Sequence, residues 1–230
     1  MSDTLKLKAA RRAVEYVRDG MVIGLGSGST AELAISVLGE RARNEALELQ
    51  CVPTSEASGI LGREMGLHIQ TLEDCPVLDL TIDGADEVDP QLELVKGLGG
   101  ALLREKIVAA ASTREIIIID DSKLVPQLGT RALLPVEVIP FAWTLAQRQL
   151  MEIARTAELR RRDDGEPYVT DNGNFILDCG FPDGIHDPAQ LDADINRMPS
   201  VVENGLFVGL AHIVIVAEIG ADDCRIMERS

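Results

Sequence analysis

A lysine and a glutamate lie on either side of a glycine-rich turn near the middle of the chain. Lys96 precedes the turn Gly97–Gly100, and Glu105 follows it on a helix predicted over 101–111. Aldose–ketose isomerisation needs a base that moves a proton between adjacent carbons and a positive charge that stabilises the enediolate oxygen. A carboxylate and an ammonium group meet both needs. In isolation, Glu105 and Lys106 fit an exposed helix face instead, because charged helix residues usually face solvent.

An acidic loop, DGADEVD, follows an apolar stretch at 77–82 that is predicted to be a strand. Its first two carboxylates, Asp83 and Asp86, lie near the strand's carboxyl end, where parallel α/β sheets usually bind ligands. Gly84 and Ala85 do not fit a calcium loop. The two carboxylates can instead hold sugar hydroxyls, and one can exchange a proton with a ring oxygen. The remaining acids are expected to lie in a solvated turn: Glu87 and Asp89.

A glycine-rich segment at 24–30, GLGSGST, lies between a predicted strand at 21–25 and a predicted helix at 31–43. Such a loop brings backbone N–H groups close to a ligand, and the helix N-terminus adds partial positive charge, so phosphate is the natural occupant. A dinucleotide fingerprint would need glycine where Ser29 stands, and a P-loop would need a Gly-Lys-Ser/Thr ending. The alternative is a tight turn capped by Ser29 or Thr30, with no ligand.

A second lysine, Lys123, follows a predicted strand at 116–119 and is a candidate anchor for phosphate or substrate. The alternative is a surface lysine in a polar turn. The spacing of the histidines and cysteines indicates neither a metal site nor disulfides, so we expect no metal, no organic cofactor and buried, reduced thiols. These residues are His68, His186, His212, Cys51, Cys75, Cys179 and Cys224.

The elements that position these residues alternate between strand and helix over the first half of the chain. Apolar periodicity predicts helices at 4–18, 31–43, 56–64 and 101–111, and strands at 21–25, 47–52, 77–82 and 116–119. This alternation is typical of a mostly parallel sheet covered by helices on both faces. The predicted fold class is therefore α/β, with a Rossmann-like main sheet.

The pattern changes after about residue 131. A helix is predicted at 141–154, followed by hairpin signals around Gly165, 172–174 and Gly180, and by another helix at 188–197. We expect a smaller α+β insert of ferredoxin-like type at 131–205. The apolar run at 206–216 is expected to return to the first sheet as a late strand, so that 1–130 and 206–230 form the α/β catalytic domain.

Composition restricts the partners. The chain has 230 residues, 46% of them hydrophobic, and a net charge of −16, so it can form a substantial core but repels polyanions. We expect no nucleic-acid or membrane partner. No apolar leader or long apolar span is evident, which predicts a soluble cytoplasmic protein. An anionic substrate would therefore depend on local positive potential from a few lysines and helix N-termini.

Several blocks together resemble the ribose-5-phosphate isomerase A family in order and approximate spacing, over nearly the whole chain. They are GLGSGSTA, TSEAS, DGADEVD, KGLGGALLREKIVA, DDSKLV, LPVEV and TDNGNFILD. The resemblance implies interconversion of ribose 5-phosphate and ribulose 5-phosphate through an enediolate, in the non-oxidative pentose phosphate pathway. It also implies a metal-independent homodimer or homotetramer.

The resemblance also implies roles for particular residues. Glu105 is the proton-shuttling base, Lys96 steadies the enediolate oxygen, and Asp83 and Asp86 bind the sugar and assist ring opening. The substrate-binding residues implied are Ser27, Gly28, Ser29, Thr30, Asp83, Gly84, Ala85, Asp86, Lys96, Gly97, Leu98, Gly99 and Lys123. Lys6 is a further candidate for the phosphate, to which no role is assigned.

One position departs from the family pattern. Leu98 stands where many relatives have a glycine, so the backbone there must avoid a glycine-only conformation or accept strain. Two other interpretations remain as alternatives. One is a related enzyme, such as a glucosamine-phosphate deaminase or a coenzyme A transferase, against which the DGADE and KGLGG blocks argue. The other is a non-catalytic sugar-phosphate sensor, which would need neither Glu105 nor Lys96.

Overall fold

The computed structural model describes residues 3–229. Its helices are α1 (Asp3–Val14), α2 (Ser29–Glu45), α3 (Glu56–Glu64), α4 (Leu102–Ala110), α5 (Trp143–Leu150) and α6 (Pro188–Asn196), with 3₁₀ turns η1 (Asp121–Lys123) and η2 (Pro140–Ala142). Its strands are β1 (Val22–Leu25), β2 (Gln50–Pro53), β3 (His68–Ile69), β4 (Leu80–Asp83), β5 (Glu87–Val88), β6 (Leu94–Val95), β7 (Glu115–Asp120), β8 (Leu134–Val138), β9 (Thr156–Leu159), β10 (Phe175–Gly180), β11 (Val201–Asn204), β12 (Leu206–Phe207), β13 (Ile213–Ala217) and β14 (Arg225–Glu228).

The chain divides into two compact units. Unit 1 comprises residues 1–85, 104–124 and 209–230, and unit 2 comprises 86–103 and 125–208. The boundaries expected from the sequence, at 131 and 205, remain a prediction about domains.

Unit 1 is built on a seven-stranded sheet with the order β14-β13-β7-β4-β1-β2-β3. All neighbouring strands are parallel except β13 and β14, which are antiparallel. After β1 the chain adds β2 and β3 on one side, and then crosses back to place β4 on the other side. The strand order therefore reverses between β1 and β4, and this is the position at which open α/β sheets bind ligands.

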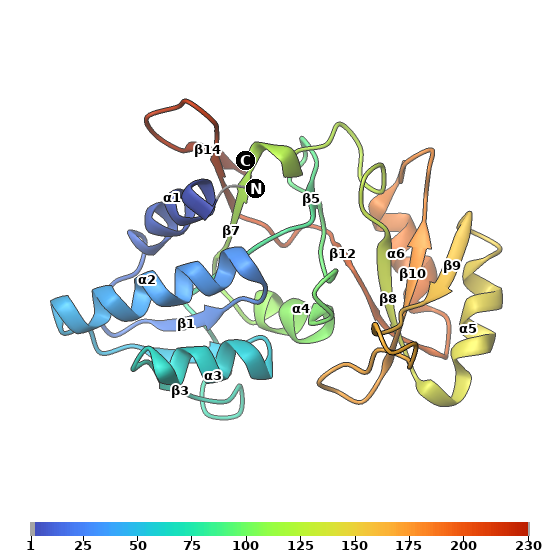
Figure 1. The fold of residues 1–230 in the computed structure, drawn as a ribbon, viewed down its shortest axis with the longest axis horizontal. Helices are drawn as coiled ribbons and strands as arrows, with labels where there is room; N and C mark the ends of the chain where they lie inside the picture. Colours follow the sequence, from blue (N-terminus) through green and yellow to red (C-terminus); the bar gives the residue numbers. More distant parts are fainter. Residues whose placement is uncertain (1–2, 230) are drawn as a thin grey trace. The chain divides into compact units, whose positions relative to one another are not determined.

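Helices cover both faces of this sheet. The neighbouring residues Val22 and Ile23 of β1 point to opposite faces. Ile23 packs in a buried cluster with Ile35 of α2 and with residues of α1, whereas Val22 packs against a second cluster that includes Val108 of α4. Figure 1 shows α1 and α2 side by side on their face of the sheet. The α/β class with a mostly parallel sheet is thus confirmed.

Unit 2 contains an antiparallel sheet with the order β11-β8-β10-β9. The chain order β8-α5-β9-β10-α6-β11 is the ferredoxin-like arrangement. Val136 and Leu177 from the sheet share one buried cluster with Leu150 of α5 and Ile195 of α6, so both helices cover the same face (Figure 1). A short sheet, β12-β6-β5, completes the unit. The expected ferredoxin-like element is therefore present.

One sequence-based expectation was wrong in part. The apolar run at 206–216 is not a single strand returning to the first sheet. Its start, β12, pairs with β6 in unit 2, and only β13 joins the main sheet beside β7. The two are separated by Gly209, whose φ of +71° suits a turn. Hydrophobicity marked the whole run as buried, but it did not reveal the break between the two sheets.

Candidate functional site

Three neighbouring parallel strands of unit 1 end at the same edge of the sheet. They are β7, β4 and β1, and they are followed by the η1 turn, the acidic loop and the glycine-rich loop respectively. The loops after β1 and β4 flank the point where the strand order reverses. The fold therefore brings together three of the segments that the sequence marked as functional, although they are far apart in the chain.

Asp83 at the end of β4 is fully buried and fixes the glycine-rich loop. Its Oδ1 accepts hydrogen bonds from the amide nitrogens of Ser27 (3.1 Å) and Gly84 (2.7 Å). A Cβ added at Gly26 would lie only 2.3 Å from that same oxygen. Glycine is thus required at position 26 because the carboxylate approaches the backbone there.

The hydroxyl of Ser27 belongs to a small network of hydroxyl groups. It lies 2.7 Å from both Thr54 Oγ1 and Ser55 Oγ, and Thr54 Oγ1 donates to the carbonyl of Leu25. Ser55 also caps the N-terminus of α3. The TSEAS block was recognised in the sequence, but no function was assigned to it. The structure shows that it supports the glycine-rich loop from the adjacent strand β2.

The start of α2 has the properties of an anion site. Gly28 adopts a φ of +87°, and among the described residues no side chain caps this helix. Gly28 and Ser29 are exposed. Lys6 of α1 donates from Nζ to Ser29 Oγ at 2.7 Å, which brings a positive charge to the helix N-terminus. Open backbone N–H groups, a hydroxyl and an ammonium group together suit a phosphate.

Glu105 and Lys123 also belong to unit 1. Glu105 lies in the first turn of α4 and is only 5% exposed, so it is not part of a solvated helix face. Lys123 is half-buried on η1. That turn is fixed by Asp120, a buried residue whose Oδ1 accepts from the Ser122 amide at 2.8 Å.

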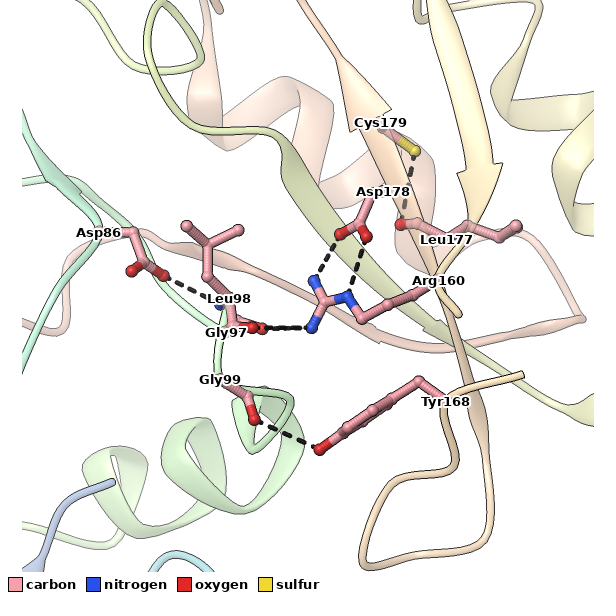
Figure 2. Close-up of polar contacts among 9 residues, drawn as sticks. All are labelled: Asp86, Gly97, Leu98, Gly99, Arg160, Tyr168, Leu177, Asp178 and Cys179. Carbon is pink, nitrogen blue, oxygen red and sulfur yellow. Dashed lines mark hydrogen bonds and ion pairs between the residues drawn. The ribbon is translucent and has the colours of Figure 1, made fainter. Parts of the chain in front are cut away.

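Thr30 on α2 and Ala85 also belong to unit 1, whereas the candidates from Asp86 to Gly99 lie in unit 2. Lys96 is 2% exposed; its amide donates to the carbonyl of Gly205 at 2.9 Å, and its Nζ lies 5.3 Å from the centre of the Phe207 ring. Asp86 Oδ2 accepts from the Leu98 amide at 3.0 Å. Gly97 has a φ of +98°. Asp86 and the Gly97–Gly99 turn that follows Lys96 are therefore brought together within this unit; Figure 2 shows Asp86 beside the turn.

Two expectations about this region are resolved by the structure. Leu98 does not adopt a positive φ, so its side chain causes no backbone strain, and it is 43% exposed. The expectation of a solvated turn for Glu87 and Asp89 was wrong, because both are buried. Glu87 Oε1 accepts from the amides of Arg131 and Ala132, at 2.6 and 2.7 Å. It is a structural carboxylate that fixes the loop before β8.

The cysteines agree largely with the expectation of buried thiols. Cys51, Cys75 and Cys179 are buried, whereas Cys224 is half-buried. Burial raises the pKa of the Cys51 and Cys179 thiols to about 12. Both therefore stay protonated and unreactive at neutral pH. Within residues 3–229 no group of three or more histidine, cysteine or acidic side chains could hold a metal ion.

Comparison with known proteins gives a consistent result. The family model for ribose 5-phosphate isomerase A (phosphoriboisomerase A) matches residues 50–220. A ribose-5-phosphate isomerase A of Gloeobacter violaceus is 55% identical, with 95% of this chain and 94% of that protein covered. One of Chloroflexus aurantiacus is 52% identical, with 94% and 90% covered.

Solved structures are similar over the full length. The ribose 5-phosphate isomerase A of Methanocaldococcus jannaschii is 40% identical with a TM-score of 0.93, covering 99% of this chain and 100% of that one. A D-ribose-5-phosphate isomerase in complex with phospho-erythronic acid is 39% identical with a TM-score of 0.94, and both chains are fully covered.

Proposed function

Because the chain belongs to the ribose 5-phosphate isomerase A family, we propose that it interconverts D-ribose 5-phosphate and D-ribulose 5-phosphate through an enediolate. The observation that carries this proposal beyond family membership is the burial of two opposite charges, Glu105 at 5% and Lys96 at 2% exposure. Charged side chains are rarely buried without either a structural partner, as for Glu87, or a catalytic purpose. Proton transfer and stabilisation of an oxyanion are two such purposes.

We propose Glu105 as the proton shuttle. In the open-chain aldose its carboxylate removes the proton from C2, and the carbonyl oxygen at C1 becomes the enediolate oxygen. Return of the proton to C1, with transfer of the hydroxyl proton from O2 to O1, yields the ketose. The Lys96 ammonium stabilises the negative charge that develops between the two steps. Asp83 assists ring opening, since its carboxylate is held in a fixed orientation by Ser27 and Gly84.

We assign the phosphate to the start of α2. Gly28, Ser29 and Thr30 supply N–H and hydroxyl donors, and Lys6 and Lys123 supply positive charge. The contact between Lys6 and Ser29 supports a role for Lys6 that the sequence left open. These few cations offset a net charge of −16 that would otherwise repel the substrate. The phospho-erythronic acid bound by the similar structure is likewise a phosphorylated sugar derivative.

The test is proton NMR of ribose 5-phosphate with the purified protein in D₂O and excess EDTA. We expect ribulose 5-phosphate to form, with deuterium from the solvent entering beside the carbonyl and with no loss of rate in EDTA. Loss of turnover in EDTA would refute the metal-independent mechanism. Binding of ribose 5-phosphate without any product would refute the isomerase and favour a sugar-phosphate sensor.

The proposed function extends to the subunit number and the location of the protein. We propose that it is a cytoplasmic homodimer or homotetramer. Exposed apolar side chains around η2 and α5 support self-association, since Phe141 is 97% and Leu145 48% exposed. Light scattering after size exclusion would measure the subunit number, and a monomeric mass would contradict this part. None of the helices within residues 3–229 is long and apolar enough to cross a membrane.

A further inference from the structure

Arg160, which directly follows β9 in unit 2, binds the backbone of the turn after Lys96. Its Nη1 donates to the carbonyl oxygens of Gly97 (3.2 Å) and Leu98 (3.0 Å) (Figure 2). The arginine lies more than sixty residues from the turn in the sequence, and nothing in the local sequence connects the two. One guanidinium group thus holds two consecutive peptide carbonyls.

The opposite side of the guanidinium is held by Asp178 on β10. Arg160 Nε donates to Asp178 Oδ2 at 2.9 Å, and Nη2 pairs with Oδ1 (Figure 2). Both side chains are largely buried, at 13% and 17% exposure. Two parallel hydrogen bonds to a carboxylate fix a guanidinium in both position and plane. The ion pair therefore presents Nη1 to the turn in a defined direction.

The direction of the two carbonyls determines the direction of the amides that follow them. In a trans peptide the C=O and N–H groups point in opposite directions, and the described residues contain no cis peptide. The Leu98 amide accordingly points away from Arg160, and it donates to Asp86 Oδ2 at 3.0 Å. By the same geometry the Gly99 amide also points away from Arg160.

Tyr168 holds the third carbonyl of the turn. Its hydroxyl donates to the Gly99 carbonyl at 3.3 Å, and its ring centre lies 5.8 Å from Arg160 Cζ. Burial raises the pKa of Tyr168, so the hydroxyl remains a donor at neutral pH. A Cβ added at Gly100 would lie 2.3 Å from this hydroxyl. The three carbonyls from Gly97 to Gly99 are therefore all held by side chains of the 160–168 segment.

We propose that Arg160, fixed by Asp178, is a positioning residue for the isomerisation: it sets the peptide planes of the Gly97–Gly99 turn and so holds Lys96 for the enediolate oxygen and Asp86 for the sugar. The inference rests on the proposed function. Misplacement of a catalytic group by about 1 Å can cost about 10²-fold in rate. Loss of the clamp should therefore lower kcat, although Arg160 itself is not assigned to the reacting atoms.

The test uses the full-length protein and ribose 5-phosphate. Arg160→Ala leaves the Asp178 carboxylate buried and unpaired, and this alone can destabilise the fold. The main variant is therefore the double substitution Arg160→Gln with Asp178→Asn, which removes both charges together. Arg162→Gln is the matched control, because Arg162 lies in the same segment and pairs with Asp164 on the surface, at 55% and 58% exposure.

We expect the double variant to keep a melting temperature close to that of the wild type, while kcat falls about 10- to 100-fold and KM changes much less. The control Arg162→Gln should match the wild type in melting temperature and in kcat. In Arg160→Ala, free guanidinium ion at non-denaturing concentration should restore part of kcat without raising the melting temperature, whereas rescue through the stability of the fold would raise both.

A double variant that folds and retains wild-type kcat would overturn the inference, and so would a loss of kcat that merely follows the melting temperature. If Arg160→Ala folds, absence of rescue by guanidinium would likewise count against it. The wild type separates this inference from the proposed function. If the wild type does not isomerise ribose 5-phosphate, the proposed function fails; if it does and the double variant is unimpaired, only the role of Arg160 fails.

Discussion

The glycine-rich loop of unit 1 and the Lys96–Gly99 turn of unit 2 are both held in place by charged side chains, but by different means. In unit 1 the Asp83 carboxylate comes from the adjacent parallel strand and binds backbone amides. In unit 2 the Arg160 guanidinium comes from the residue that follows β9, far from the turn in the sequence, and binds backbone carbonyls. The first device follows from the main sheet itself, whereas the second is supplied by the antiparallel sheet of unit 2. An anionic side chain thus fixes the backbone amides of one loop, and a cationic side chain fixes the backbone carbonyls of the other.

The largest effect should come from Glu105, the proposed proton shuttle. We predict that Glu105→Gln lowers kcat by about 10²- to 10⁴-fold, the usual contribution of a positioned base, with the fold intact. Rates measured by NMR, together with circular dichroism, would check this. Glu64→Gln on α3 is the control, because Glu64 is exposed. Turnover near the wild-type value in Glu105→Gln would remove this residue from the mechanism.

The contact between Asp83 and Gly26 can be broken with one methyl group. Gly26→Ala places a Cβ about 2.3 Å from the Asp83 carboxylate, so that either the loop or the carboxylate must move. We predict a loss of about 10²-fold in kcat/KM and a lower melting temperature. Gly99→Ala in the Lys96–Gly99 turn is the comparison in unit 2, because nothing lies within 4 Å of an added Cβ there and its φ is not positive. Equal losses of kcat/KM in both variants would show that the glycine-rich loop and the Lys96–Gly99 turn tolerate an added methyl group equally well.

The proposed phosphate anchor should have a smaller effect, and a different one. Lys123→Ala is predicted to raise KM about tenfold or more with little change in kcat, since its partner is the non-reacting phosphate. Initial rates over a range of ribose 5-phosphate concentrations would separate the two parameters. A fall in kcat with unchanged KM would contradict the assignment and place Lys123 near the reacting carbons.

Leu98 should matter least. Because its backbone is not in the left-handed region, Leu98→Gly relieves no strain and only increases the freedom of the unfolded chain. We predict a loss of about 0.4–1 kcal/mol in the free energy of unfolding and nearly unchanged kcat, because Arg160 and Asp86 still hold the turn. Chemical denaturation would measure the first and the NMR assay the second. An increase in stability would mean that the turn prefers a glycine at this position.

Much of the fold and part of the site followed from local sequence signals. The helix over 56–64, the strand before the glycine-rich loop and the α6 segment were predicted closely, because apolar periodicity and glycine positions are local properties. The position of Asp83 at a strand end could also be predicted, because the apolar stretch directly before it indicates the strand. The length of α5 was overestimated: apolar residues continue to 154, but the helix ends at Leu150.

Contacts between distant segments could not be inferred in the same way. Glu87 looked like part of a solvated acidic turn, but the amides of 129–132 surround it and bury it. The hydrogen bond between Lys6 and Ser29 exists only because α1 packs against α2, and the sequence does not indicate that packing. Arg160 carried no signal, because a guanidinium that binds backbone carbonyls needs no particular residue type at its target.

The sequence by itself determined which residues could do chemistry, the α/β alternation and the presence of a second, antiparallel region. Only the tertiary structure decided the strand order that brings the loops after β1 and β4 to one edge, the burial of Glu105 and Lys96, and the role of Arg160 as a clamp. The physical reason is that residue type and spacing fix local conformation, whereas burial and backbone hydrogen bonding depend on segments that meet only in the folded chain.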